Sequence, residues 1–338
     1  MTTQKIEIST TTIIKFIAII LGLWATYYIL DVLVLLFIVV LLTIALQPSV
    51  TKLTSWGVPK VLSILIVFVA MAAVFGLAVY IIIPSLVTQI SELAQNAPTY
   101  INKVTNFSAS FSAKGTQQIL DTISGSLSKL TEGFFGAIIA LFGGVISVLT
   151  VLVLTFYMLL DEGGIKKALI NLIPQKNRAR FAVMAQHIVV KMGLWIRGQL
   201  TLMIIVGIVT ALAMQIIGVP YALSLGVAAG ILEIIPVIGP IVAGLLAVLI
   251  AIAAGMAIWK IAIVVALYII IQQLESQLLV PKIMQKAMGV SPIVVIIAIL
   301  IGGKLLGVGG AILAIPIVGI LSVLLQEYFK GRKQEESS

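Results

Sequence analysis

The chain has 338 residues, of which 61% are hydrophobic and 10% are charged, whereas a soluble domain carries about a quarter charged residues. Mean hydropathy is +1.23, and apolar runs long enough to cross a hydrocarbon core of about 30 Å recur along the chain. These values exclude a soluble globular domain and predict an all-α, polytopic helical membrane protein. The absence of cysteine excludes disulfides, thiolate metal sites and cysteine nucleophiles.

About eight transmembrane helices are expected, two of them as broken or re-entrant hairpins. The first apolar run follows two lysines as a signal peptide would, but it lacks an A-x-A cleavage site and leads through Asp31 into a second run, which favours a retained anchor. The predicted spans, in chain order, are 13–30, 32–46, 61–83, 134–160, 200–217, a broken pair over 221–258, 261–280 and a second broken pair over 292–325.

Two segments are neither spans nor short loops. Residues 88–133 are polar but carry apolar residues at helical spacing in two stretches that separate near Gly115, which predicts an external amphipathic helical hairpin. Residues 177–194 place apolar and basic residues on opposite sides of a helix, a pattern typical of a helix in the cytoplasmic interface.

These features divide the chain into six expected parts. They are N-terminal transmembrane segments (1–87), the external hairpin (88–133), a transmembrane helix (134–160), a cytoplasmic basic loop with the interfacial helix (161–196), a C-terminal transport core with broken hairpins (197–326) and a cytoplasmic polar tail (327–338).

The positions of lysine and arginine predict the orientation. With the N-terminus inside, most of the 21 basic residues fall in cytoplasmic segments, so both termini are expected in the cytoplasm. Topology thus explains the net charge of +9, and no nucleic-acid partner is expected. The basic residues left on the external side are Lys103, Lys114, Lys129 and Lys260.

An internal repeat is indicated in the C-terminal half. One span is followed by an apolar pair broken near Pro236, and a second span by an apolar pair broken near Gly302 to Gly310. The charge pattern gives the two units opposite orientations. Interrupted segments in corresponding places of two such units are typical of alternating-access transporters.

Glu233 is the sharpest single feature, because a charged side chain at the bilayer centre costs on the order of 3 kcal/mol and usually faces a cavity or a partner. Pro236, Gly239 and Pro240 interrupt the helix after it and free backbone carbonyls. The residues predict a site for a cation or a polar solute. The alternative is that Glu233 lies near an interface and pairs with Arg197 for packing.

A second polar cluster lies in the sequence QQLESQLLVPK, which begins at Gln272. More than half of the helix circumference is polar, so this helix cannot face lipid on all sides; the polar residues are Gln272, Gln273, Glu275, Ser276 and Gln277. A water-filled inner vestibule is the favoured interpretation; a helix end emerging into water is the alternative.

Three further residues are weaker candidates. Arg197 suits snorkelling to the headgroups, Gln199 suits a hydrogen bond across a bundle, and Lys304 suits either a counter-ion for the two glutamates or a turn between half-spans. The sequence has no phosphate-binding loop, no H-E-x-x-H and a single histidine, so neither an enzyme nor a cofactor or resident metal is expected.

These motifs resemble the autoinducer-2 exporter family, also called the PerM-like family. Seven short motifs carry the similarity. In the central segment they are FYMLLDEGG from Phe156 and LIP from Leu172. Further along the chain they are RGQL from Arg197, EIIPVIGP from Glu233, QQLESQLLVPKIM from Gln272, GVSP from Gly289 and GGKLLGVGGAILAIP from Gly302. The resemblance implies a bacterial inner-membrane secondary transporter with about eight spans. Some members export the quorum-sensing signal autoinducer-2, and others are sodium or lithium/proton antiporters. Because the family varies at the residue before its IP motif, the resemblance favours Glu275 over Glu233 as the shared carboxylate.

Three functions follow as hypotheses. The first is export of a small polar molecule, with autoinducer-2 as the named candidate, through a site that includes Glu275, Gln272 and Gln277. The second is Na⁺(Li⁺)/H⁺ antiport, with transported sodium near Glu275 or Glu233. The third is a membrane scaffold that binds partners through residues 88–133. All three hypotheses have the lipid bilayer as a partner of the protein, and a homo-oligomer is expected.

Overall fold

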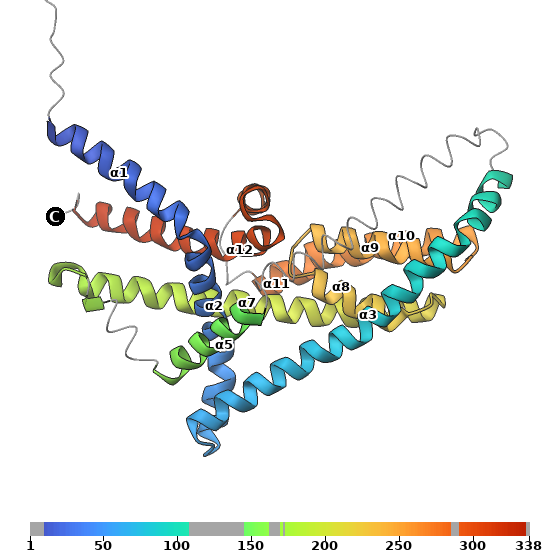
Figure 1. Cartoon of the computed structure of the whole chain (residues 1–338), viewed down its shortest axis with the longest axis horizontal. Helices are drawn as coiled ribbons and strands as arrows, with labels where there is room; N and C mark the ends of the chain where they lie inside the picture. Colours follow the sequence, from blue (N-terminus) through green and yellow to red (C-terminus); the bar gives the residue numbers. More distant parts are fainter. Residues whose placement is uncertain (1–9, 108–144, 162–169, 172, 285–290, 336–338) are drawn as a thin grey trace, which may run out of the picture.

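The computed structural model describes residues 10–107, 145–161, 170–171, 173–284 and 291–335. The described residues form helices joined by turns, without a strand, so the all-α prediction is confirmed (Figure 1). The elements are α1 (Thr10–Tyr28), α2 (Leu30–Ser55), α3 (Lys60–Phe107), α5 (Val145–Leu160), α7 (Gln175–Ile217), α8 (Ala222–Leu232), α9 (Ile238–Ala253), α10 (Ile258–Leu274), the π-helical turn η1 (Glu275–Leu279), α11 (Val280–Met284) and α12 (Pro292–Glu335).

The membrane character of the chain is evident in these helices. Within the described residues, five helices are long and apolar enough to cross a membrane: Leu30–Ser55, Lys60–Ile82, Asn177–Ile217, Ile258–Ile283 and Ile293–Glu327. Three more apolar helices are shorter, at Ile146–Leu160, Ala222–Leu232 and Ile238–Ile252. The chain is therefore a polytopic helical membrane protein, with the bilayer as its surroundings.

Two helices are longer than expected. α3 runs without a break from Lys60 to Phe107, through Pro84, so the first arm of the expected external hairpin continues the preceding span. The helix also contains Pro98, and prolines are tolerated inside membrane helices where neighbouring groups satisfy the freed backbone. The second arm of that hairpin lies outside the described residues, as do residues 134–144 of the next expected span.

α7 likewise joins the expected interfacial helix to the expected span. It contains 43 residues, which corresponds to about 65 Å, and no proline separates its basic first half from its apolar second half. It ends at Gly218, whose left-handed conformation (φ 81°, ψ 31°) lets its N–H bond to the carbonyls of Met214 and Gln215.

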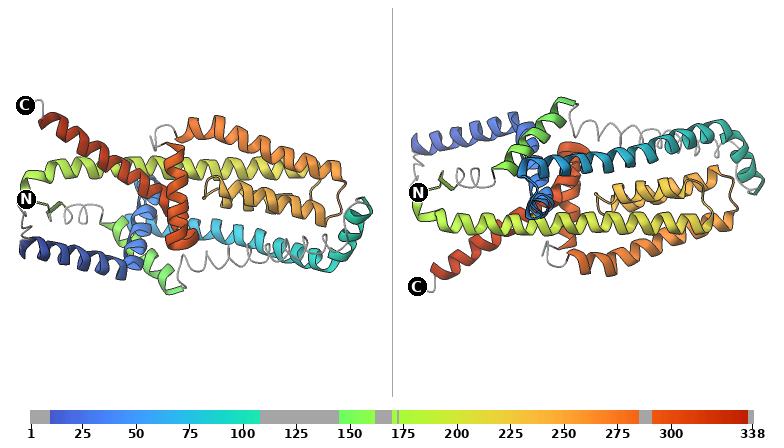
Figure 2. Two further views of the ribbon diagram at one scale, coloured as in Figure 1. Left: turned by 90° about the horizontal axis from the view of Figure 1, so that it is seen from above. Right: turned by 90° about the horizontal axis from the view of Figure 1, so that it is seen from below.

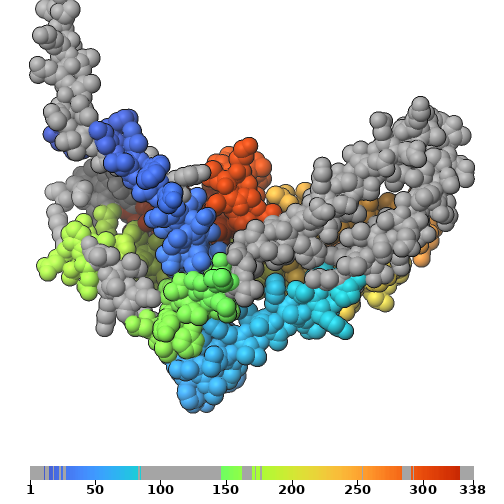
Figure 3. Space-filling view, in the orientation of Figure 1, coloured from blue at the N-terminus to red at the C-terminus, as the bar shows by residue number. Residues whose placement is uncertain are grey.

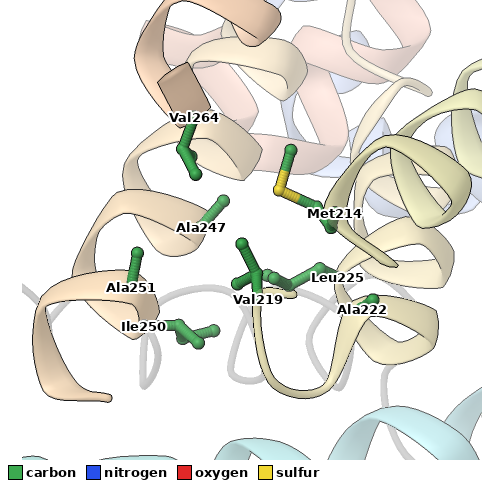
Figure 4. Close-up of a cluster of buried hydrophobic side chains, with 8 residues drawn as sticks. All are labelled: Met214, Val219, Ala222, Leu225, Ala247, Ile250, Ala251 and Val264. Carbon is green, nitrogen blue, oxygen red and sulfur yellow. The ribbon is translucent and has the colours of Figure 1, made fainter. Parts of the chain in front are cut away.

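The centre of the C-terminal half is a bundle of α7, α8, α9 and α10. Figure 2 shows the four helices side by side, with the turns 218–221 and 254–257 at the same end. Figure 4 shows side chains from all four helices meeting near that end in one apolar cluster: Met214, Val219, Ala222, Leu225, Ala247, Ile250, Ala251 and Val264.

Glycines bring α7 and α8 into close contact. A Cβ added at Gly226 would lie 2.6 Å from the carbonyl oxygen of Gly207, and one added at Gly230 would lie 2.6 Å from that of Met203. Small residues four positions apart are a common way for membrane helices to approach each other, because lipid offers no hydrophobic drive for their association. The close fit holds α8 along α7.

The first predicted broken pair corresponds to α8 and α9. α8 has 11 residues and spans about 17 Å, too short to cross a hydrocarbon core of about 30 Å, so α8 and α9 together form a re-entrant hairpin. The hairpin turns at residues 233–237. Gly239 permits the turn, since a Cβ there would collide with the carbonyl oxygen of Leu232.

The second predicted broken pair corresponds to α12, which is kinked at Leu306 and Gly307. Gly307 has a positive φ of 62°, and Gly302 and Gly310 place the two halves backbone against backbone. α12 packs mainly on α7, whereas the hairpin α8–α9 contacts both α7 and α10. The two units of the predicted repeat thus share a break but differ in packing.

A second group of helices lies beside this bundle. α2, α3 and α5 pack around Val50, Ile64, Val67 and Leu159. In Figure 3, the described atoms of α3 extend from the bottom of the face towards the right, and those of α5 (green) lie above the start of α3. α3 also contacts α8 and α9, and so connects the two groups.

Replacing Gly239 by alanine tests the hairpin turn. We expect Gly239→Ala to lower the free energy of unfolding by about 2 kcal/mol, because the added methyl group meets the Leu232 carbonyl and the turn must shift. Thermal unfolding in detergent measures the effect. The control is Gly76→Ala in α3, where an added Cβ meets no atom within 4 Å. The turn geometry is contradicted if both variants unfold at the same temperature as the wild type.

Candidate functional site

The site is centred on the tip of the α8–α9 hairpin. α8 ends at Leu232, and Glu233 follows as its C-cap, with its N–H bonded to the Ala229 carbonyl at 3.0 Å. The Glu233 side chain is only 1% exposed. A carboxyl group is thus fixed at the end of a short helix, inside the bundle.

The hairpin tip has an unusual backbone. Val237 has φ 71° and ψ −52°, and the Ile238 N–H bonds to the Pro236 carbonyl at 2.9 Å. These values describe a γ-turn of the rare, strained form, and a positive φ is especially unfavourable for a β-branched residue. Strained backbone of this kind is concentrated at functional sites.

Gln199 connects the tip to α7. Its Nε2 donates a hydrogen bond of 2.6 Å to the backbone carbonyl of Glu233, and the residue is 4% exposed. Carbonyls at the end of a helix lack a partner within the helix. Gln199 satisfies one of them from the buried face of α7, which also includes Leu202 and Val206.

Glu275 comes from α10, at the point where the helix widens. The π-helical turn Glu275–Leu279 begins at this residue, and the Val280 N–H reaches back five residues to the Glu275 carbonyl. Single π-helical turns inside α-helices frequently mark functional sites. Glu275 is 3% exposed and continues the buried stripe of α10 formed by Val264 and Ile271.

The two glutamates meet. The side chains of Glu233 and Glu275 share a hydrogen bond, although they are far apart in the sequence and belong to different helices. An ionised carboxylate only accepts hydrogen bonds, so a bond between two carboxyl groups requires a proton on one of them. One oxygen on each group, Oε2, is buried without a hydrogen-bond partner in the chain.

The surroundings of the pair are apolar. Val206, Leu232, Ala229 and Ala243 form a cluster on one side of the tip. On the other side, Ile235 packs with Trp195 of α7 and with Ile299, Ala311 and Ile315 of α12. Within the described residues, no lysine or arginine forms an ion pair with either carboxyl group.

The structure brings together three of the predicted site residues, Gln199, Glu233 and Glu275, with the backbone break at Pro236, Gly239 and Pro240 beside them. The polar neighbours of Glu275 point elsewhere: Gln272 is half-buried, whereas Ser276 and Gln277 are exposed and bond to Gln273 on their own helix. Their expected place in the pathway stays a prediction.

The two basic candidates lie away from the carboxyl pair. Arg197 is exposed and its Nε bonds to the Gly193 carbonyl at 3.2 Å, so it does not pair with Glu233. Lys304 is exposed two residues before the kink of α12, a position that fits the predicted turn between two half-spans rather than a counter-ion.

Two buried hydroxyl groups were not anticipated. Thr210 Oγ1 and Tyr268 Oη are buried without a hydrogen-bond partner in the chain. Thr210 is on the same face of α7 as Gln199, and Tyr268 is on the same face of α10 as Glu275. The sequence signal was available, since hydroxyl residues inside apolar runs at helical spacing from a site residue share its face.

Metal ligands do not gather in the part of the chain that the structure describes: no group of three or more His, Asp and Glu side chains is found there. The chemistry of the site is thus that of two carboxyl groups, one amide and the carbonyls of a broken helix.

Comparison with known proteins assigns the family. The sequence model of the family described as "AI-2E family transporter" matches residues 13–330, which is nearly the whole chain. The chain belongs to the AI-2E transporter family. The resemblance seen in the motifs is thereby confirmed.

Curated proteins with similar sequences come from several organisms. "Putative transport protein YrrI" of Bacillus subtilis is 29% identical over 92% of this chain and 91% of its own length. "Putative permease PerM" of Escherichia coli K12 is 28% identical over 89% of this chain and 88% of its own length. "Putative transport protein MJ1177" of Methanocaldococcus jannaschii is 22% identical over 69% of this chain and 71% of its own length. Family and fold together identify this chain as a multi-pass membrane transporter.

Alanine variants test the geometry of the carboxyl pair. We expect Glu275→Ala to lower the free energy of unfolding by about 1–3 kcal/mol, because it leaves the buried Glu233 carboxyl without its partner. Glu275→Gln retains a donor and an acceptor and is expected to restore most of the loss. Gln277→Ala, on the exposed side of the same turn, serves as the control. Equal unfolding temperatures for Glu275→Ala and Gln277→Ala would contradict the buried pair.

Proposed function

We propose that this AI-2E family member is a proton-coupled secondary transporter that moves a small polar solute outward across the bacterial inner membrane. The carboxyl pair Glu233–Glu275 is the observation that carries the proposal. Buried ionisable residues in membrane segments mark ion or substrate pathways far more often than they support packing. A pair that needs a proton to stay in contact links the site to proton movement.

The solute site consists of the two unpartnered carboxyl oxygens, Glu233 Oε2 and Glu275 Oε2, with Gln199 and the carbonyls of the hairpin tip around them. Oxygens that only accept hydrogen bonds suit a solute that carries hydroxyl groups. The candidate solute is autoinducer-2, because the motifs resemble those of the autoinducer-2 exporter family. Gln272, Ser276 and Gln277 belong to the inner part of the pathway in this proposal.

A second candidate function is Na⁺(Li⁺)/H⁺ antiport, and the carboxyl pair also supports it. Hard cations prefer carboxylate and carbonyl oxygens, and both kinds are present at the hairpin tip. A cation would replace the proton between Glu233 and Glu275. The third hypothesis, a membrane scaffold, does not require two carboxyl groups buried at a broken helix. No catalytic step is part of any of these proposals.

We also propose that both termini face the cytoplasm. The start of α1, the basic start of α7 and the end of α12 lie at one end of the molecule, and Lys260 follows the turn at the opposite end (Figure 2). The positive-inside rule then orients the chain. Exposed apolar side chains on α3, such as Val69, Val74 and Tyr80, suit lipid or a second copy in a homo-oligomer.

Flux in proteoliposomes tests the function. In the wild type, an imposed pH gradient is expected to drive accumulation of labelled autoinducer-2 or, for antiport, to dissipate faster when sodium or lithium is added. Glu275→Gln, which replaces the shared proton by an amide donor that cannot be released, is expected to lower the proton-linked rate at least about a hundredfold. Gly76→Ala in α3, where an added Cβ meets no atom within 4 Å, is the control and should retain wild-type flux.

The outcomes separate the candidates. Solute accumulation without a sodium effect supports export, and a sodium or lithium effect without solute accumulation supports antiport. Wild-type flux in Glu275→Gln would exclude a role for the pair in coupling. Absence of both fluxes in the wild type, together with a protein bound to residues 88–133, would favour the scaffold.

A further inference from the structure

We propose that Gln199 is a positioning residue that holds Glu233 against Glu275, so that loss of the shared proton releases the hairpin tip from α10. The tip is the segment Glu233–Val237. This inference rests on the proposed function and adds how the protonation of the site moves the backbone.

Three attachments hold the tip. The first is the hydrogen bond of 2.6 Å from Gln199 Nε2 to the Glu233 carbonyl, which attaches the tip to α7. The second is the hydrogen bond between the side chains of Glu233 and Glu275, which attaches it to α10. The third is the apolar contact of Ile235 with Trp195 and with α12. Only the second depends on a proton.

Gln199 and Glu275 act on opposite sides of the same residue. Gln199 fixes the backbone of Glu233, and with it the direction in which the side chain leaves the end of α8. Without that bond, the Glu233 carbonyl is a buried acceptor without a partner, which is unfavourable. The C-terminal turn of α8 is then expected to rearrange so that the carbonyl finds another donor. Gln199 therefore affects the carboxyl pair without touching it.

The tip is strained in the conformation that these attachments hold. The γ-turn at Val237 places a β-branched residue at φ 71°. Strain of this kind persists only where surrounding contacts enforce it. Loss of one attachment thus favours a relaxed backbone at the tip.

The proton step is simple. The proton leaves a carboxyl oxygen for water, and Glu233 and Glu275 both become carboxylates, which accept but do not donate hydrogen bonds. Two negative charges in contact among apolar side chains repel each other strongly. The bond between the hairpin and α10 is lost, and a solute or a cation can then enter between the two groups.

Other charged groups on the neighbouring elements are engaged elsewhere or exposed. On α7, Lys191 donates to Ser322 Oγ and Arg197 bonds to the Gly193 carbonyl. On α10, α11 and α12, Lys260 stacks over Trp259, the Tyr268 hydroxyl is buried, Lys282 and Lys304 are exposed, and Glu327 pairs with His187 of α7. A change of exchange with pH at the tip thus reports on the carboxyl pair.

Hydrogen–deuterium exchange of the full chain in nanodiscs tests the inference. The reporters are four amides in the tip or directly after it, those of Ile234, Ile235, Ile238 and Gly239, whose hydrogen bonds hold the backbone of the turn. After correction for the intrinsic pH dependence of exchange, their exchange is expected to increase about fivefold from acidic to alkaline pH in the wild type, the factor typical of one lost hydrogen bond. The turn at Trp56–Val58, also held by backbone hydrogen bonds, is the internal control and should not respond.

Two variants separate positioning from coupling. Glu233→Gln can donate to Glu275 without a proton, so tip exchange should stay low at all pH values. Gln199→Met keeps a side chain of similar shape but removes the donor, so exchange should already be high at acidic pH and change little with pH. Neither result is expected from general loosening of the fold, which would also raise exchange at the control turn.

The inference is overturned if wild-type tip exchange does not change with pH, or if Gln199→Met retains the wild-type pH profile. Exchange requires no transport, so this failure is distinct from failure of the proposed function. Proton-linked flux with a pH-independent tip would leave the function standing without the proposed release.

Discussion

Two carboxyl groups that touch among apolar side chains cannot both carry a negative charge, and the centre of this transporter is built around such a contact. Glu233 and Glu275 come from different helices and meet where both helices are irregular, one at a hairpin tip and the other at a π-helical turn. The carbonyls released by the break are partly satisfied by Gln199. The proton between the carboxyl groups is therefore part of what holds the structure together.

The helices packed around the carboxyl pair fix the position of the hairpin tip. Glycines on α8 and α7 bring the two backbones together, and Gly239 lets α9 begin directly against the end of α8. Apolar clusters from α7, α8, α9, α10 and α12 enclose the tip from two sides. With the apolar contacts fixed, a change of charge at the pair has few ways to be accommodated other than movement of the tip.

Much of this fold was predictable from the sequence, because hydropathy and helix breakers act locally. The breaks near Pro236 and Gly307 and the candidate residues Glu233, Glu275 and Gln199 could all be recognised by residue type alone. The continuous α3 and α7 could not, since the polar and apolar halves of each differ in composition and Pro84 stands between the two halves of α3 without ending the helix. The contact between Glu233 and Glu275 depends on how α10 packs against the hairpin, and no local pattern encodes it. The π-helical turn has no sequence signature. Both glutamates were candidates from the sequence, and only the resemblance favoured Glu275 over Glu233, whereas the structure presents them as a pair.

The shared proton is tested most directly by infrared spectroscopy of the membrane-embedded protein. A protonated carboxyl group has a C=O stretch that a carboxylate lacks. The wild type at neutral pH should show such a band, and the band should be absent from the Glu233→Gln, Glu275→Gln double variant. Identical carboxyl regions in the two spectra at neutral pH would mean that the pair carries no proton, and would contradict the account.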